Sequence, residues 1–412
     1  MRISTMQQFH TGVRSLLDNQ ESTVRTQQQI STGRRVLTPS DDPVASTRIL
    51  QLQQDISLRE QFTKNLTGAK NRLNLEEATL SSVTENISRI RELTVNAGNG
   101  SMTVEDRGFI ASEIDTRLDA LVDLMNTKDA SNTYIFSGFK GESQPFSTRS
   151  GGGVSYEGDD GERFLDISNS TKIQTNDSGK SLFVDVQSIQ DTFFTQDNPS
   201  NIGTGFISNG FVANQEAYSE FYPEDIVIQF NADSLVTPPA PNYSVLTRSE
   251  NRPIDGLVGV SYIPGVEQVI EGANFKIAGD PEPGDTFFVR SSPKQSIADT
   301  VAGLVEGLRS LQDNPEDSET LQVLIANSLS NLDFAQASVS EVQSEIGGRL
   351  NTIDNIDNLH QDVDLVSKDI LSQLQDIDFA EAVSRLSLES FLLEAAQQSF
   401  TQINRLSLFN SL

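Results

Sequence analysis

The last part of the chain carries apolar residues at a spacing of seven. The repeated positions are Phe379, Leu386, Leu393 and Phe400, and Glu389 interrupts the intermediate row that Ala382, Ala396 and Ile403 form. This heptad spacing places apolar side chains along one side of a helix that packs on another helix. Because a single helix cannot bury its own apolar face, the stretch 379–412 must find a partner in this chain or in another copy.

A second amphipathic helix is predicted at the other end of the chain, over residues 1–32. Its apolar residues follow spacings of three and four, and the pattern then weakens among several glutamines. An ordinary surface helix explains this pattern, but a coiled-coil partner for residues 379–412 explains it as well. The residues that we expect to form this pairing and self-assembly interface are Ile3, Met6, Phe9, Val13, Leu16, Phe379, Leu386, Leu393, Phe400, Ile403, Leu406 and Phe409.

Two long helices are predicted in between. In the first, over residues 43–97, Glu76 is the exception in a set of apolar heptad positions, which are Leu66, Ala69, Leu73, Leu80, Val83, Ile87 and Ile90. The second starts at Pro315 and reaches about Leu374, with one row of Leu332, Val339, Ile346 and Ile353 and another of Ala335, Val342, Ile356 and Val363. Shorter helices follow the capping patterns Thr103–Asp106 and Ser296–Asp299.

Between the helical segments, glycine, proline and asparagine punctuate short β-branched and aromatic runs. Val154–Glu157 and Arg163–Ile167 predict a hairpin around Gly158–Gly161, and Ser181–Val186 predicts a strand. Further strands are expected at 172–175, 225–230, 242–247, 258–263, 274–278 and 286–290.

The order helix, β, helix predicts an elongated α+β protein with terminal coiled-coil helices and a long-helix bundle into which a β-rich domain is inserted. We expect terminal helices at 1–42 and 377–412, a helical bundle domain at 43–140 and 290–376, and a β-rich domain of one or two lobes at 141–289.

The segment after the first helix reads as a capped loop. Gly33 suits a helix C-cap, Asp42 suits an N-cap, and Pro43 suits the first helical position. Arg34 and Arg35 lie near a helix C-terminus and therefore complement its dipole. These structural roles explain nearly every residue of the segment.

Composition narrows the function classes. The formal net charge is −28, which makes nucleic acid and anionic membranes unfavourable partners. The chain has no cysteine, which excludes disulfides and thiol catalysis. The N-terminus has no apolar signal-peptide core and no apolar run approaches a membrane span. A cytoplasmic protein and a protein exported without a cleaved signal both fit these features.

Candidate chemistry is sparse. None of the nucleophile, zinc-protease or phosphate-loop motifs occurs. His10 and His360 are far apart in sequence, and the acidic residues around His360 favour a solvated acidic helix face over a metal site. The acidic turn from Glu157 to Glu162 lacks the spacing of a calcium loop. The sequence therefore predicts no enzyme, no cofactor and no metal.

Several segments carry a resemblance to a known family. ISTGRRVLTPSDDPVAS at 30–46, SKDILSQLQDIDFAEAVSRL at 367–386 and the final LSLFNSL resemble the flagellin superfamily. NTYIFSGFKGESQPF at 132–146 is similar to its hook-associated members in particular. The loop residues that match the family signature are Gly33, Arg34, Ser40, Asp41, Asp42 and Pro43. Residues 190–270 match no pattern of that family.

The resemblance implies a structural protein of the bacterial flagellum, a junction adaptor between hook and filament. It implies a homo-oligomeric ring, neighbouring hook-associated and filament-side proteins, and a flagellar export chaperone as partners. It also implies type III export and an extracellular location, with terminal helices that pair on assembly. A flagellin filament subunit, and a secreted adhesin or glycan-binding protein using residues 190–270, are the alternatives.

Overall fold

The computed structural model describes residues 5–409, without the side chains of residues 5, 6, 8 and 403–409. The chain divides into two compact units. The first combines Met1–Asn65 with Asp354–Leu412, and the second is the continuous stretch Leu66–Ile353. The predicted division into three domains stays a prediction.

The first unit is helical. It contains α1 (Thr5–Thr32), α7 (Phe379–Phe409), the beginning of α2 (Pro43–Ala97) and the end of α6 (Pro315–Gln375). In this unit α2 and α6 run antiparallel, because Arg59 donates to the Ser367 hydroxyl (2.8 Å) and Phe62 stacks near His360. These helices lie where the apolar periodicity predicted them.

The end of α6 differs from the predicted pattern in two ways. Val363 is exposed, and the buried positions are His360 and Ser367, which continue the heptad of Ile346 and Ile353. The prediction that His360 belongs to a solvated acidic face was therefore wrong. The imidazole packs on the Phe62 ring, and burial lowers the pKa of His360.

The long helices of the second unit bury the predicted rows. The apolar heptad positions of α2 from Leu66 to Ile90 are almost fully buried, as are Leu332, Ala335, Val339, Ile346 and Ile353 on α6. Arg91 of α2 pairs with Asp333 of α6 (2.8 Å), and Gly98, just after α2, lies next to Ile325 of α6, so the two helices run antiparallel here too. The heptad pattern is thus confirmed as a helix-packing pattern.

The shorter helices start at their predicted caps. Thr103 and Asp106 form a reciprocal capping box at α3 (Val104–Met125). At α5 (Ile297–Ser310) the Ser296 side chain accepts from the Asp299 amide, but the Asp299 carboxylate turns to Arg149 instead (3.0 Å).

The small hairpins next to the helices differ from the prediction. β1 (Phe146–Thr148) pairs with β2 (Val154–Tyr156), and β3 (Phe164–Asp166) pairs with β4 (Lys172–Gln174), so the predicted hairpin across Gly158–Gly161 was wrong. In the turn itself, the Asp159 carboxylate accepts hydrogen bonds from the amides of Phe139 (2.7 Å) and Gly161 (2.8 Å), so it binds the turn to the segment before β1. The strand predicted at 181–186 is a π-helical turn, η1 (Lys180–Val184).

The rest of the insertion forms antiparallel sheets. One sheet has the order β10-β9-β8-β13-β5, and in another β12 pairs with β11, β6 and β7. The bounds are β5 Gln187–Asp197, β6 Phe206–Ile207, β7 Phe211–Val212, β8 Ile226–Asn231, β9 Asn242–Thr247, β10 Val260–Ser261, β11 Glu267–Ile270, β12 Ala273–Ala278 and β13 Thr286–Lys294, with α4 at Gln215–Phe221 and the 3-10 turn η2 at Asp233–Leu235.

These sheets have a core of their own. Fourteen buried residues between Phe193 and Val289, among them Phe230, Tyr243 and Phe287, form one cluster. The chain enters through β5 and leaves through β13, and Gln187 lies opposite Lys294 in that strand pair. The insertion therefore leaves the helices and returns to them at one place.

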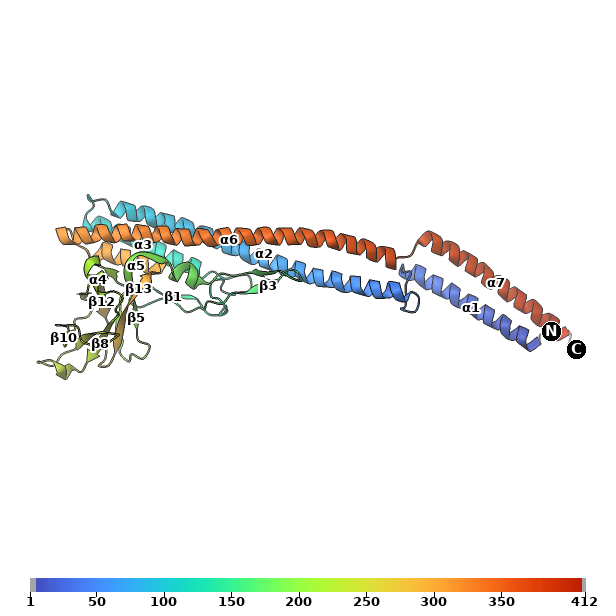
Figure 1. Cartoon of the computed structure of the whole chain (residues 1–412), viewed down its shortest axis with the longest axis horizontal. Helices are drawn as coiled ribbons and strands as arrows, with labels where there is room; N and C mark the ends of the chain where they lie inside the picture. Colours follow the sequence, from blue (N-terminus) through green and yellow to red (C-terminus); the bar gives the residue numbers. More distant parts are fainter. Residues whose placement is uncertain (1–4, 410–412) are drawn as a thin grey trace. The chain divides into compact units, whose positions relative to one another are not determined.

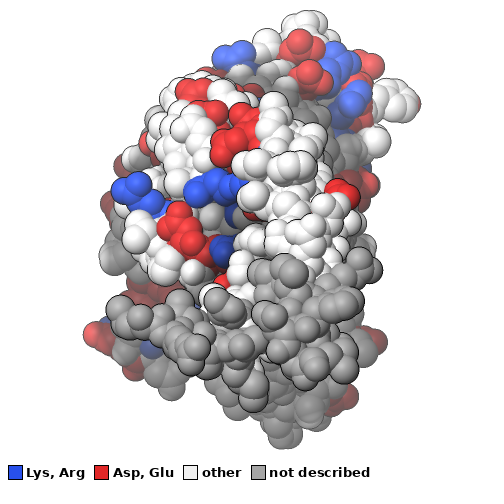
Figure 2. Space-filling model, turned by 90° about the vertical axis from the view of Figure 1, so that its right-hand side faces the viewer, with Lys and Arg blue, Asp and Glu red and all other residues white. Residues whose placement is uncertain are grey.

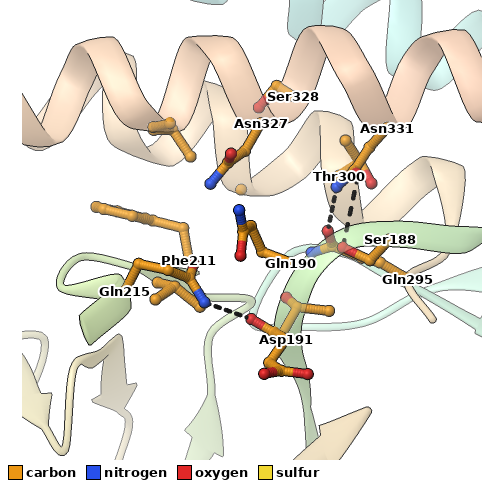
Figure 3. Close-up of a pocket in the computed structure, with 14 residues that line it drawn as sticks. Ser188, Gln190, Asp191, Phe211, Gln215, Gln295, Thr300, Asn327, Ser328 and Asn331 are labelled. Carbon is orange, nitrogen blue, oxygen red and sulfur yellow. Dashed lines mark hydrogen bonds between the residues drawn. The ribbon is translucent and has the colours of Figure 1, made fainter. Parts of the chain in front are cut away.

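Polar side chains line the joint between this insertion and the helices of its unit (Figure 3). Asn331 of α6 accepts from the Ile189 amide of β5 (2.9 Å) and donates to Gln295 (3.1 Å). Gln215 at the start of α4 donates to the Asp191 carbonyl (3.0 Å). A cavity of about 40 Å³ remains among them. Hydrogen bonds therefore fix the insertion on the helices.

Candidate assembly interface

The two terminal helices of the first unit lie side by side and antiparallel (Figure 1). At one end the Phe379 ring lies over Gly33, and at the other Phe400 packs on Gly12 and on the Phe9 ring, with 5.3 Å between ring centres. The N-terminal and C-terminal helices are thus each other's partner within one chain. The structure brings the two predicted halves of the interface together.

The predicted interface is only half covered by this pairing. On α7, Leu386, Leu393 and Phe400 are partly buried and Phe379 is exposed. On α1, Val13 and Leu16 are partly buried and Phe9 is exposed. Ile3 lies outside the described residues, as do the side chains of Met6, Ile403, Leu406 and Phe409. A substantial share of the apolar surface is therefore left for other contacts.

Among the described side chains of α1, the most buried are polar and were missed in the sequence. Thr26 and Gln29 are buried, and the Gln29 side chain donates to the Arg35 carbonyl (2.7 Å). The only signal for them was the weakening of the apolar pattern in the second half of the helix. Polar side chains are used here because the helix packs on a loop, whose backbone groups need partners.

Backbone hydrogen bonds tie the two interhelical connections to each other. The Arg35 amide donates to the Gln375 carbonyl (2.7 Å), and the Ile377 amide donates to the Gly33 carbonyl (3.0 Å). Gly33 has a φ of +68°, which glycine adopts without strain. These bonds fix where α1 and α7 begin to run together.

The loop with the family signature is held by its two aspartates. Asp41 accepts from the amides of Leu37 and Thr38 (both 2.9 Å) and pairs with Arg25 of α1. The hydrogen bond from the Thr38 amide is the main reason why the pKa of Asp41 is lowered. Asp42 caps α2 by accepting from the Ala45 amide (2.9 Å).

The remaining signature residues lie in the same short segment. Arg34 forms an isolated β-bridge with Asp376, the Ser40 hydroxyl is 2.8 Å from that of Thr38, and Pro43 begins α2. Each has a structural partner, as the capped-loop interpretation expects. What they do in assembly stays a prediction.

The described surface near the chain ends offers no block of one charge. Seen from the side where the chain ends lie in Figure 1, basic and acidic residues form small groups between wide uncharged areas (Figure 2). Among the described residues, no cluster of histidine and carboxylate side chains could hold a metal ion. No helix in the described range is long and apolar enough to cross a membrane. The described surface near the chain ends is thus largely uncharged.

Comparison with known families gives the class of protein. Residues 3–140 match the family model for the bacterial flagellin N-terminal helical region, and residues 329–412 match that for the C-terminal helical region. Together the two matches cover more than half of the chain, and they contain both terminal helices. The chain belongs to the flagellin superfamily.

Within that superfamily, the full-length similarity is to flagellar hook-associated protein 3. The chain is 24% identical to that protein of Escherichia coli K12 and 25% identical to that of Salmonella typhimurium, in both cases over 409 residues and 99% of each chain. A flagellin of Escherichia coli O127:H6 is 29% identical over 103 residues, which is 25% of this chain and 19% of the flagellin.

Solved structures agree with this assignment. The hook-associated protein 3 of Legionella pneumophila is 28% identical with a TM-score of 0.54, and the match covers 79% of this chain and 98% of that one. The flagellar junction protein FlgL of the same organism is 29% identical with a TM-score of 0.50 and coverages of 79% and 99%. The predicted α+β fold with long terminal helices and a β-rich insertion is confirmed.

Proposed function

We propose that this chain is a structural protein of the bacterial flagellum that joins the hook to the filament, and that its copies assemble through α1 and α7. The supporting observation is the half-covered apolar seam between these helices, on a chain that resembles hook-associated protein 3 over 99% of its length. Flagellins match only a quarter of the chain, so a filament subunit is the weaker candidate.

The mechanism is burial of apolar side chains that one chain leaves exposed. Each fully buried leucine or phenylalanine contributes about 1.5–3 kcal/mol, so a few per copy offset the entropy lost when copies associate. Rings of copies, contacts to neighbouring hook-associated and filament-side proteins, and extracellular placement by flagellar export belong to this proposal. An export chaperone would cover α7 before assembly, and the chain catalyses no reaction.

Removal of α7 tests the proposal. A chain that ends at Asp378 should lose its place between hook and filament, because α1 then has no partner. Its second unit should stay folded, since the buried rows of α2 and α6 lie within Leu66–Ile353. Electron microscopy of flagella from cells that carry only this variant measures the first effect, and thermal unfolding of the purified variant measures the second.

The full-length chain expressed in the same cells is the control. We expect hooks that carry no filaments in the truncated strain. We also expect the purified truncated protein to unfold as a folded protein does. Filaments attached to hooks in the truncated strain would contradict the proposed role of the terminal helices.

A further inference from the structure

The turn between α2 and α3 contains an asparagine followed by a glycine. Asn99 and Gly100 are both exposed, and a Cβ placed on Gly100 would meet no atom within 4 Å. Because glycine has no Cβ of its own, nothing hinders the approach of its backbone nitrogen to the side-chain carbon of the preceding asparagine. An asparagine in this setting can lose its side-chain amide to its own main chain.

The groups that this reaction needs are available in the turn. Within the described part of the chain, neither the Gly100 amide nor the Asn99 side-chain amide donates a hydrogen bond. The Asn99 backbone is held in place, since its amide donates to the Asn96 carbonyl (3.1 Å) and its carbonyl accepts from the Met102 amide (3.0 Å). The attacking nitrogen and the leaving amino group are therefore unengaged while the turn itself is fixed.

Ser101 places two hydrogen-bond donors on the carbonyl oxygen of the Asn99 side chain. The Ser101 hydroxyl donates to Asn99 Oδ1 (3.0 Å), and the Ser101 amide donates to the same oxygen (3.3 Å). Negative charge develops on this oxygen when a nucleophile adds to the carbon that carries it. Donors that are already in position before the reaction lower its barrier, as in an oxyanion hole.

The second asparagine–glycine pair of the chain has a different environment. Asn209 is buried, and its side-chain amide donates to the Asp299 carbonyl (3.0 Å). Gly210 is enclosed, because a Cβ placed on it would lie 2.1 Å from the Asn274 carbonyl oxygen and 2.9 Å from the Phe193 ring. Attack by the Gly210 nitrogen would require the Asn209 side chain to leave its buried position. The same dipeptide is therefore protected at 209 and accessible at 99.

We propose that Asn99 is a self-modification site, which deamidates in the folded protein. The Gly100 nitrogen loses its proton to water and attacks Asn99 Cγ. A C–N bond forms, and Nδ2 takes a proton from water and leaves as ammonia. One water molecule then hydrolyses the cyclic imide. Opening at Cγ gives aspartate, and opening at the main-chain carbonyl carbon gives isoaspartate. The reaction needs no partner and does not depend on the proposed junction function.

The modification changes a joint between the ends of three helices. The Met102 carbonyl accepts from Arg107 of α3 (3.4 Å), whose guanidinium also donates to the Leu311 carbonyl just after α5 (3.0 Å) and pairs with Asp313 (2.7 Å). Isoaspartate lengthens the main chain by one carbon atom, so the turn from Asn99 to Met102 cannot keep its geometry. Aspartate keeps the main chain but adds a charge near the negative end of the α2 dipole.

Mass spectrometry of the full-length chain tests this reaction. The purified protein is incubated at pH 8, sampled daily and digested with trypsin, and fragmentation of the peptide Glu92–Arg107 distinguishes Asn99 from Asn96. We expect Asn99 to deamidate with first-order kinetics while Asn209 stays unchanged. In guanidinium chloride both should react, because unfolding exposes Asn209. An Asn99 that stays intact, or an Asn209 that reacts as fast in the folded chain, would refute the proposal.

Substitutions separate the role of the turn from that of the dipeptide. Gly100→Ala should slow the reaction about tenfold, because a methyl group hinders the attack. Ser101→Ala should slow it several-fold in the folded chain but not in guanidinium chloride, since the hydroxyl donates to Asn99 Oδ1 only where the turn is formed. Ser131→Ala, at an exposed serine of another turn, is the matched control, and circular dichroism checks that each variant is folded. If Ser101→Ala left the folded-chain rate unchanged, or slowed both states equally, the assistance by Ser101 would be wrong.

Discussion

At the residue scale, Glu76 is a buried carboxyl group in an otherwise apolar row of α2. It stands in the α2 heptad where the neighbouring positions are apolar, and it is 1% exposed. One carboxyl oxygen accepts from the Asp177 amide (3.2 Å), while Asp177 itself is held by two hydrogen bonds from Arg349 (2.7 and 3.0 Å). Burial and the nearby Asp177 carboxylate raise the pKa of Glu76 well above its ordinary value of 4.5.

This environment predicts a pH dependence of stability. The charged groups that face Glu76 are Arg72 one turn earlier on α2, Asp177 on the loop after β4, and Arg349 on α6. Because the folded-state pKa lies above the unfolded-state value, the stability that neutral Glu76 provides is present below about pH 4.5 and lost as the pH rises through the folded-state pKa.

Glu76→Gln should remove this loss, because an amide keeps the acceptor for the Asp177 amide and carries no charge. We expect the variant to exceed the wild type in unfolding free energy by about 1–3 kcal/mol at pH 8 and to differ little at pH 4. Urea unfolding followed by circular dichroism measures this. Glu77→Gln, at the adjacent exposed position, is the control. A Glu76→Gln variant that is less stable than the wild type at both pH values would refute the explanation.

At the scale of elements, α7 carries its apolar residues in two different settings. Leu386, Leu393 and Phe400 are partly buried in the pairing with α1, whereas Val383, Leu388, Phe391 and Leu392 are exposed and spread over the rest of the helix surface. The heptad pattern revealed only the first set, because the exposed residues do not share one face.

Substitution of two phenylalanines of α7 tests which side chains stabilise its pairing with α1. Phe400→Ala should weaken the pairing of α1 with α7 in the unassembled chain, because it removes the ring contact with Phe9, worth about 0.5–1.5 kcal/mol, as well as buried area. Phe391→Ala should leave that pairing unchanged, since the ring is exposed. Hydrogen exchange of the α1 amides compares the two variants. If both variants changed the exchange of the α1 amides equally, the Phe400 ring would have no special role in the pairing.

At the scale of the whole molecule, the β-rich insertion is built as a separable part. Its core cluster lies entirely between Phe193 and Val289, and its first and last strands pair where they leave the helices. The fragment 187–294 should therefore fold on its own, with a β-type circular dichroism spectrum and a cooperative thermal transition. An unfolded fragment would show that the insertion depends on the helices.

Deletion of the insertion tests the alternative that the chain is an adhesin or glycan-binding protein that uses residues 190–270. A chain in which two glycines replace residues 188–293 should still join hook and filament in electron micrographs. Its melting temperature should fall, because Phe211 no longer covers Gly303 and Gly307 of α5. Loss of assembly would instead place an essential contact in the insertion.

The sequence by itself determined the helices, their caps and the family. Apolar spacing and cap residues are local signals, so α2 starts at Pro43 and α3 at its Thr103 box as predicted. Only the tertiary structure decided which strands pair around Gly158–Gly161, why Glu76 and His360 are buried, and that Phe379 and Phe391 of α7 are exposed while Phe400 is partly buried. These depend on side chains and backbone groups that are distant in sequence, whose desolvation and pairing no local pattern records.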